Sequence, residues 1–190
     1  EKLKNLKLTE VLFVDFQKQL AGHGYTAKSG QMIDASFVEV PRQRNSREEN
    51  ARIKANKIPL EWLTEDKKPM LSQKDTDARW TKKNHETHYG YKSHVNVDQD
   101  HKLIHSYQVT NAAVHDSQVF DELLDKSEDE KGCKRPVYAD SAYRSAEKEQ
   151  ALAKQGIPSQ IHEKSVKNSP LTDEQKTANR EKSKVRSRVE

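Results

Sequence analysis

The sequence contains a single cysteine, Cys133, among its 190 residues. One thiol cannot form a disulfide within the chain or build a cysteine-rich zinc site, so both are excluded. A reducing compartment suits such a chain, and we expect a cytoplasmic location. No apolar run approaches the roughly 18 residues of a membrane helix, and no signal peptide is visible at the start. The chain begins with Glu1 rather than Met and ends at Glu190, so we expect both ends to continue in a longer protein.

Apolar residues are also scarce, since 32% of the chain is hydrophobic and 34% is charged. The apolar residues are clustered rather than diluted, which predicts a folded core with long polar excursions. The length fits one domain that carries an insertion better than two full domains. The formal net charge of +4 suits a polyanionic partner but does not identify one.

Hydrophobic periodicity predicts the elements of the first half of the chain. A helix is expected over residues 8–21 and a strand over residues 31–40. Residues 41–86 are polar with short apolar groups, which indicates an inserted, mostly exposed segment with one or two short helices. Strands follow over 88–98 and 103–110, joined by a turn. A short helix then begins near residue 116, with Asp116 or Ser117 as its N-cap.

In the second half, strand and helix patterns alternate. A strand is predicted over 136–143, a helix from Ser145 to Gln155, another strand over 157–162, and a last helix that begins at Thr172 and runs to the chain end. The whole order predicts an α/β fold, with a mixed sheet flanked by helices and a polar insertion after the first strand. We expect an N-terminal helical segment over 1–29 and a main domain over 30–190, with 41–86 as its insertion.

Two carboxylates, Asp34 and Asp140, lie inside apolar strand-like runs. A carboxylate in such a run costs free energy unless it is paired or binds a cation. Each one taken alone could equally be a hydrogen-bonded core acid or a strand-end cap. If the two strands end side by side, the acids could share Mg²⁺ or Mn²⁺, which prefer oxygen ligands. Glu190 is a third candidate, although a frayed terminal residue is the simpler interpretation of its position.

Long ordered blocks around these acids resemble the DDE-type transposases of bacterial insertion sequences, in the insertion-sequence-five group. The matching blocks are GQMIDASFVEVPRQRNSREEN, KDTDARWTKKN, HYGYKSHVNVD, VTNAAVHDSQVFDELLD, VYADSAYRSAE and NREKSKVRSRVE. The resemblance covers nearly the whole chain from about residue 8.

The resemblance implies a ribonuclease H-like catalytic domain that cleaves and joins DNA strands with two divalent metal ions, Mg²⁺ or Mn²⁺. It assigns Asp34, Asp140 and Glu190 as catalytic residues and metal ligands. The family places a Tyr-x-x-Arg-x-x-x-Glu pattern on the late helix. Here Arg186 and Glu190 fit that pattern, while Ser183 stands where the family has Tyr. The implied partners are double-stranded DNA from transposon ends and target, with a homodimer as the assembly, in the bacterial nucleoid.

Basic residues near the second and third acids are candidate phosphate contacts, which would hold DNA without reading its sequence. On the last helix they recur at four-residue spacing and share a face, although such a stripe is often only a solvated surface. The candidate DNA-binding residues are Arg144, Lys176, Arg180, Lys184, Arg186 and Arg188.

Three further residues, His115, Asp116 and Tyr143, are predicted to face the catalytic site and to contact the metal ligands rather than the metal ions. His115 and Asp116 open a helix after a strand end, and Tyr143 follows Asp140 in the matching block. Trp62 and Trp80 lie in the insertion, where packing is the default interpretation and stacking on an unpaired base is the alternative.

The sequence leaves three functions open. The first is a transposase that cleaves and transfers strands, the second is a nuclease of the same fold that cuts without joining, and the third is an inactive remnant that only binds DNA.

Overall fold

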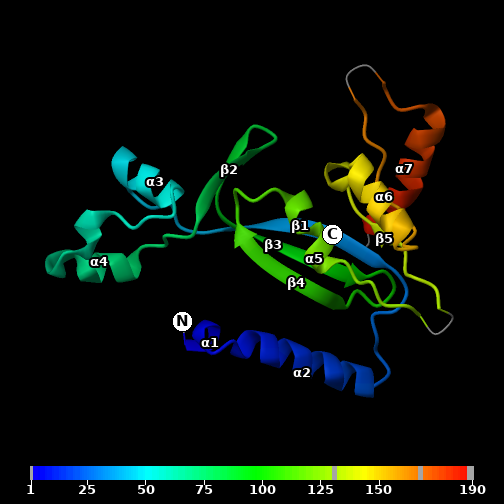
Figure 1. Cartoon of the computed structure of the whole chain (residues 1–190), viewed down its shortest axis with the longest axis horizontal. Helices are drawn as coiled ribbons and strands as arrows, with labels where there is room; N and C mark the ends of the chain where they lie inside the picture. Colours follow the sequence, from blue (N-terminus) through cyan, green and yellow to red (C-terminus); the bar gives the residue numbers. More distant parts are fainter. Residues whose placement is uncertain (1, 130–131, 167–168, 188–190) are drawn as a thin grey trace. The chain divides into compact units, whose positions relative to one another are not determined.

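A mixed sheet organises the chain in the computed structural model, which describes residues 2–129, 132–166 and 169–187 (Figure 1). Within these residues the strands are β1 (Gln31–Glu39), β2 (Arg79–Lys83), β3 (Glu86–Asp98), β4 (Ile104–Asn111) and β5 (Val137–Tyr138). The strand order is β2-β3-β1-β5, with β4 paired to β3. β1 and β5 are parallel, whereas β2 and β3 are antiparallel. The predicted α/β fold with a mixed sheet is therefore confirmed.

Contacts between Cα atoms divide the chain into two compact units. The first comprises the residues up to Ile33, Asn96–Ser106 and the residues from Leu124 onward. The second comprises Asp34–Val95 and Tyr107–Leu123. β1, β3 and β4 each contribute residues to both units, so the division cuts across the strands rather than between them.

The first unit contains the helices α1 (Lys2–Asn5), α2 (Leu8–Gly22), α6 (Ala146–Lys154) and α7 (Asp173–Arg186). Local sequence sets their ends. Ser145 caps α6 by accepting a hydrogen bond from the Lys148 N–H. Thr172 and Gln175 form the predicted capping box of α7, with hydrogen bonds in both directions. Figure 1 shows α6 and α7 gathered beside β5.

A buried glutamine links the strands of the first unit to the loop after Leu124. Gln31 is 2% exposed, and its amide both accepts from the Asp125 N–H (2.9 Å) and donates to the Asp125 carbonyl (3.0 Å). Asn96 donates to the same Gln31 oxygen at 3.0 Å. The Gln31 side chain thus ties the start of β1 to the main chain at Asp125, because an amide can both donate to and accept from a peptide group.

Helix α2 confirms the helix predicted over residues 8–21. Its apolar side chains are not buried, although helical periodicity of this kind usually indicates burial. Its apolar side chains Val11, Leu12 and Phe16 are 58–62% exposed. The helix is held instead by Gln17, whose amide donates to the carbonyls of Ile104 (3.1 Å) and His105 (2.8 Å).

The second unit contains the polar segment between β1 and β2. It folds into α3 (Arg47–Lys54), the short 3-10 helices η1 (Leu60–Leu63) and η2 (Glu65–Lys67), and α4 (Lys68–Gln73). Ser46 and Glu49 form a capping box at the start of α3. Trp62 is fully buried and donates to Glu49 at 2.7 Å, so it packs this segment. The strand β2 inside the expected insertion was not predicted, because three of its five residues, Arg79, Lys82 and Lys83, are charged.

Gly90 marks the closest approach of β3 to the end of β1. Its φ is +145°, and a Cβ at this position would lie 2.3 Å from the Val38 carbonyl oxygen. The Val40 N–H donates to the neighbouring Tyr89 carbonyl at 3.1 Å. A glycine is required here, because a side chain would collide with backbone that is itself hydrogen-bonded.

Three sequence predictions need correction. The strand expected over 136–143 is only the two residues of β5, and residues 141–143 form a 3-10 helix instead. The N-cap near residue 116 is His115, whose ring nitrogen accepts from the Ser117 N–H, and the turn that follows is η3 (Asp116–Gln118) before α5 (Phe120–Leu123). The strand expected over 157–162 is reduced to a parallel bridge between Val137 and Ser159. The Pro158 ring removes a donor from this segment, which limits a regular ladder.

The most buried carboxylate that the structure describes at the β3–β4 turn is Asp98, which is 1% exposed. It accepts from the Ser29 N–H and hydroxyl at 3.0 Å each, and from the N–H groups of Asp100 and His101. Burial alone would raise the pKa of Asp98, but these hydrogen bonds together lower it. Asp98 is a turn-forming acid and illustrates the alternative that the sequence leaves open for any buried carboxylate.

His94 gives the second unit a dependence on pH. It is fully buried, and its Nε2 lies 2.8 Å from the Thr110 hydroxyl oxygen. Burial lowers the pKa of His94 below its usual 6.5, Lys92 lowers it further, and Asp116 opposes them. Because the unfolded chain then binds a proton more readily than the folded one, the free energy of unfolding falls as pH drops below about 6.5.

We therefore expect the urea midpoint to be lower at pH 5.5 than at pH 7.5, and the difference to shrink in His94→Gln. Urea titrations of both proteins at the two pH values measure this. An identical pH difference in the two proteins would contradict the role of His94, since His105 and His162 also have lowered pKa values and would then account for it all.

Among the residues that the structure describes, no helix combines the length and the apolar character that a membrane crossing demands.

Candidate catalytic site

Asp34 follows three buried residues of β1, Gln31, Met32 and Ile33, and is itself half-buried. It is the first residue of the second unit. The apolar run that made it conspicuous in the sequence is therefore a real strand interior.

Asp140 lies just beyond β5 in the first unit, after the buried residues Val137 and Ala139. Its Oδ1 accepts from the Ala142 N–H at 2.7 Å and so caps η4 (Ser141–Tyr143). This is the strand-end cap that the sequence leaves open. The cap engages one carboxylate oxygen, so it is compatible with a cation bound through Oδ2.

The segment after Gly156 runs alongside β5 and brings His162 to Asp140. The Val137 N–H donates to Pro158 (3.0 Å), Gln160 donates to Val137 (2.8 Å), and the His162 N–H donates to Ala139 (3.1 Å). Burial lowers the pKa of His162, as do Arg186 and Lys182, whereas Asp140 raises it. His162 therefore lies within the electrostatic reach of both Asp140 and the predicted DNA-binding residue Arg186.

Helix α7 is fixed to this segment by polar side chains on one of its faces. The Asn179 amide accepts from the Glu163 N–H at 2.8 Å and donates to the Glu163 carbonyl at 3.1 Å. Lys182 donates to the Ile161 carbonyl at 2.9 Å, and the Ser183 hydroxyl lies 3.4 Å from His162 Nε2. Residues 179, 182 and 183 share a face at helical spacing, and they determine where α7 lies relative to Asp140.

Replacing Asn179 with alanine is expected to lower the free energy of unfolding by about 1–3 kcal/mol, because both Glu163 backbone groups lose their partner. Asn179→Asp, which keeps the acceptor and loses the donor, should fall between. The neighbouring Arg180→Ala is the matched control and should change stability by less than about 0.5 kcal/mol. Urea denaturation of the variants measures this, and equal losses in the Asn179 and Arg180 variants would argue against the contact.

Arg144 was predicted to bind DNA, and the structure places it in an internal network. It donates to the Ile161 carbonyl at 3.0 Å and pairs with Glu163 at 2.9 Å and Glu149 at 3.3 Å. These contacts orient Arg144 beside the segment that carries His162. The Arg144 guanidinium thus contacts Ile161 and Glu163, the same two residues that α7 contacts.

The predicted basic stripe lies on α7 with varied surroundings. Lys176 pairs with Asp173 and Lys184 with Glu181 on the same helix. These pairs are exposed to solvent, so they contribute little to stability. Arg180 is exposed and Arg186 is half-buried. Arg188 and Glu190 lie outside the described residues.

The three predicted supporting residues belong to different units. Tyr143 is buried in η4 of the first unit, next to Asp140 in sequence. His115 and Asp116 belong to the second unit. Asp116 pairs with Lys92 at 2.8 Å, and Lys92 also donates to the Val114 carbonyl at 2.7 Å.

Sequence reasoning missed Lys92, His162 and Asn179. Lys92 is only 8% exposed, and its position between Tyr91 and Ser93 in an alternating strand was the available signal, because the pattern assigns it to an inner face. Nothing local distinguishes His162 or Asn179, because Asn179 contacts Glu163 across 16 positions and His162 lies beside Ser183 across 21 positions. Within the described residues, no three His, Cys, Asp or Glu side chains gather closely enough to hold a metal ion.

Comparisons with known proteins agree with the blocks found in the sequence. A family model described as "Transposase DDE domain" matches residues 25–190. The "Transposase for insertion sequence element IS1106" of Neisseria meningitidis serogroup B is 31% identical over 189 residues, which cover 96% of this chain. The chain spans 59% of the length of that relative. No solved structure matches the chain.

Proposed function

The chain belongs to the transposase DDE domain family, and from this premise we propose that it catalyses the cleavage and transfer of DNA strands at insertion-sequence ends. The proposed ligands of divalent cations are Asp34, Asp140 and Glu190. Residues 30–190 form the proposed ribonuclease H-like catalytic domain, with 41–86 as its insertion and 1–29 as a helical segment. The proposed partners are the transposon end, the target duplex and a second copy of the chain, in the bacterial nucleoid.

The parallel register of β1 and β5 is the observation that carries this proposal. Gln31 pairs with Val137 and Met32 with Tyr138. Asp34 lies two residues beyond Met32, and Asp140 lies two residues beyond Tyr138. Side chains two positions apart on a strand point to the same face of a sheet, so this register supports a common role for the two acids.

The donor set fits a hard cation. The proposed ligands offer only carboxylate oxygens, which Mg²⁺ and Mn²⁺ prefer, and Asp140 Oδ2 is the oxygen that does not cap η4. When bound, a pair of such ions activates the attacking oxygen and stabilises the leaving one. The residues of this chain hold the ions, and the exposed cations of α7 position the DNA backbone.

The proposed reaction has two steps. Water attacks a phosphodiester phosphorus, the bond to the 3′-oxygen breaks, and the strand end leaves as a 3′-hydroxyl after taking up a proton. That hydroxyl then attacks a phosphodiester of the target, and the displaced target 3′-oxygen takes up the proton that the attacking hydroxyl releases. No covalent enzyme intermediate is needed.

A strand-transfer assay tests the proposal. The chain is incubated with a pre-cleaved insertion-sequence end, a supercoiled target and Mg²⁺ or Mn²⁺, and joined products are resolved on a gel. Joined product that requires the cation supports the proposal. Cleavage without joining would identify a nuclease of the same fold, and binding without either reaction would identify an inactive remnant.

A further inference from the structure

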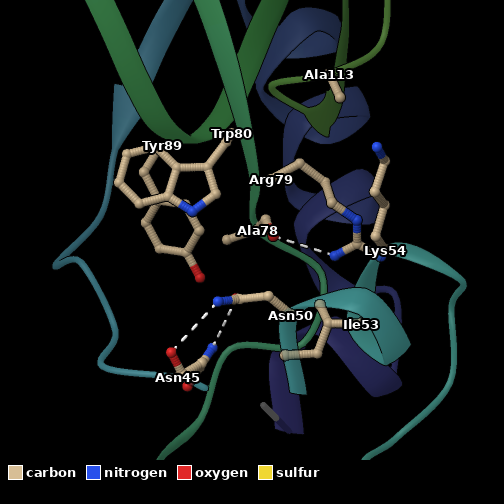
Figure 2. A pocket seen from close by; sticks show the side chains of 9 residues that line it. All are labelled: Asn45, Asn50, Ile53, Lys54, Ala78, Arg79, Trp80, Tyr89 and Ala113. Atoms are coloured by element: carbon tan, nitrogen blue, oxygen red, sulfur yellow. Dashed lines mark hydrogen bonds between the residues drawn. The ribbon is translucent and has the colours of Figure 1, made fainter. Parts of the chain in front are cut away.

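The second unit contains a cavity of about 240 Å³ that the proposed reaction does not use. Its lining residues belong to the polar segment, to β2 and β3, and to the loop after β4 (Figure 2). The residues that line this cavity include Asn45, Asn50, Arg79, Trp80 and Tyr89. The cavity is smaller than the roughly 300–1,000 Å³ of drug-sized sites, so it suits a ligand of one or two rings.

An aromatic pair forms one side of the cavity. Trp80 and Tyr89 occupy directly paired positions on β2 and β3, and their ring centroids are 4.8 Å apart at an interplanar angle of 38°. Tyr89 is buried, whereas Trp80 remains 45% exposed. Figure 2 shows both rings at the side of the cavity. An indole held by a buried neighbour and left open to solvent is a stacking surface for another planar group.

Polar groups lie opposite and below the rings. The Asn50 amide accepts from the Asn45 Nδ2 and donates to the Asn45 main-chain carbonyl, both at 3.4 Å, near the limit for hydrogen bonds. The Asn50 amide can therefore turn toward the edge of a ligand at little cost, whereas Asn45 is held in place because its Oδ1 accepts from Lys74 at 2.6 Å. Arg79 is fixed by bonds to the Thr76 carbonyl at 2.6 Å and to Asn56 at 2.7 Å, so its guanidinium presents a rigid planar cation.

The surroundings of the cavity favour an anionic polymer. Residues 42–57 contain six basic and two acidic side chains, and this surplus of four equals the formal net charge of the whole chain. One of the two acids, Glu49, is occupied by Ser46 and Trp62. Arg42 lies over the Trp80 ring, with its guanidinium carbon 5.4 Å from the ring centroid, so a positive charge lies against the face of the indole.

We propose that this cavity binds one unpaired nucleobase of a DNA strand, stacked on Trp80, with its polar edge on the Asn45 and Asn50 amides and its phosphate near Arg42. Base–aromatic stacking tolerates every base, because each has a π-face. A paired base cannot enter, since its partner and stacked neighbours occupy the space around it. The proposal rests on DNA being the substrate of the proposed function and adds a second contact, in the polar segment, for strands that have been opened.

Fluorescence anisotropy with the full chain tests the proposal. The probes are a labelled single strand of about 12 nucleotides, a length within the site sizes of known single-strand binders, and the same sequence as a duplex. Trp80→Ala should weaken single-strand binding about tenfold and leave duplex affinity within about twofold. Trp80→Phe keeps a ring and should restore most of the affinity. Tyr107→Ala removes an exposed aromatic side chain of β4 and is the matched control.

The outcomes separate the two proposals. Unchanged single-strand affinity in Trp80→Ala, or an equal loss for both probes, overturns the nucleobase site and leaves the proposed function standing. If the unmodified chain binds neither probe, the proposed function fails and the nucleobase site fails with it. A loss for the single strand alone, rescued by Trp80→Phe, supports the site even if strand transfer is never observed.

Discussion

Replacing Asp140 with asparagine is expected to reduce strand cleavage and transfer by a factor of about 1,000, a magnitude typical of removing one electrostatic contributor to a reaction of this kind. The asparagine keeps an oxygen that can accept from the Ala142 N–H, and asparagine caps helices as well as aspartate does. The fold of η4 should survive, so the loss reports the missing charge. Gel quantification of joined product, at equal protein concentration, measures the effect.

The matched control is Asp173→Asn, which removes an exposed carboxylate from the first turn of α7. It should leave activity within about twofold, because exposed ion pairs contribute little. DNA affinity should persist in Asp140→Asn, since the proposed phosphate contacts belong to other residues. Full activity in Asp140→Asn would remove this residue from the proposed ligand set.

Replacing Gly90 with alanine is expected to lower the free energy of unfolding by about 2–5 kcal/mol. Left-handed backbone costs a residue with a Cβ roughly 1–2 kcal/mol, and overpacking adds about 1–3 kcal/mol. The new Cβ would meet the Val38 carbonyl oxygen at 2.3 Å, and this oxygen is backbone that cannot rotate away. Such a loss is a large fraction of the 5–15 kcal/mol that stabilises a typical domain.

Gly24→Ala separates the two contributions, because Gly24 also has a positive φ, +85°, but nothing lies within 4 Å of its added Cβ. It should lose only about 1–2 kcal/mol. Urea denaturation of both variants measures the difference. Equal losses at the two positions would mean that the β1 backbone shifts to accommodate the side chain, contrary to the tight approach described for β3.

The sheet was predictable where the sequence alternates. β1 and β3 were placed within one or two residues, since residues 31–40 mix apolar and β-branched side chains and residues 88–98 alternate apolar with polar ones. β2 was missed because Arg79, Lys82 and Lys83 give it the composition of a loop. It is a strand because it pairs residue by residue with β3, from Arg79–Gly90 to Lys83–Glu86. Pairing with an already formed strand overrides weak local preference.

Asp34 and Asp140 were chosen as candidate ligands because they interrupt apolar runs. The same criterion does not separate Asp98, which is more buried than either, from a candidate ligand. What distinguishes Asp98 is the set of four hydrogen-bond donors that surrounds it, and these depend on tertiary structure. The sequence could not reveal the Asn179 and Arg144 contacts for the same reason, since both reach a segment that local periodicity assigns to a different element.

The position of helix α7 depends on an amide that contacts the main chain of Glu163. Every residue type except proline offers that same N–H and carbonyl. Substitutions at position 163 can therefore change its charge, and with it the ion pair to Arg144, without loosening the attachment of the helix. Residue 163 can accordingly be substituted to change the charge near Asp140 while the hydrogen bonds that hold helix α7 are kept.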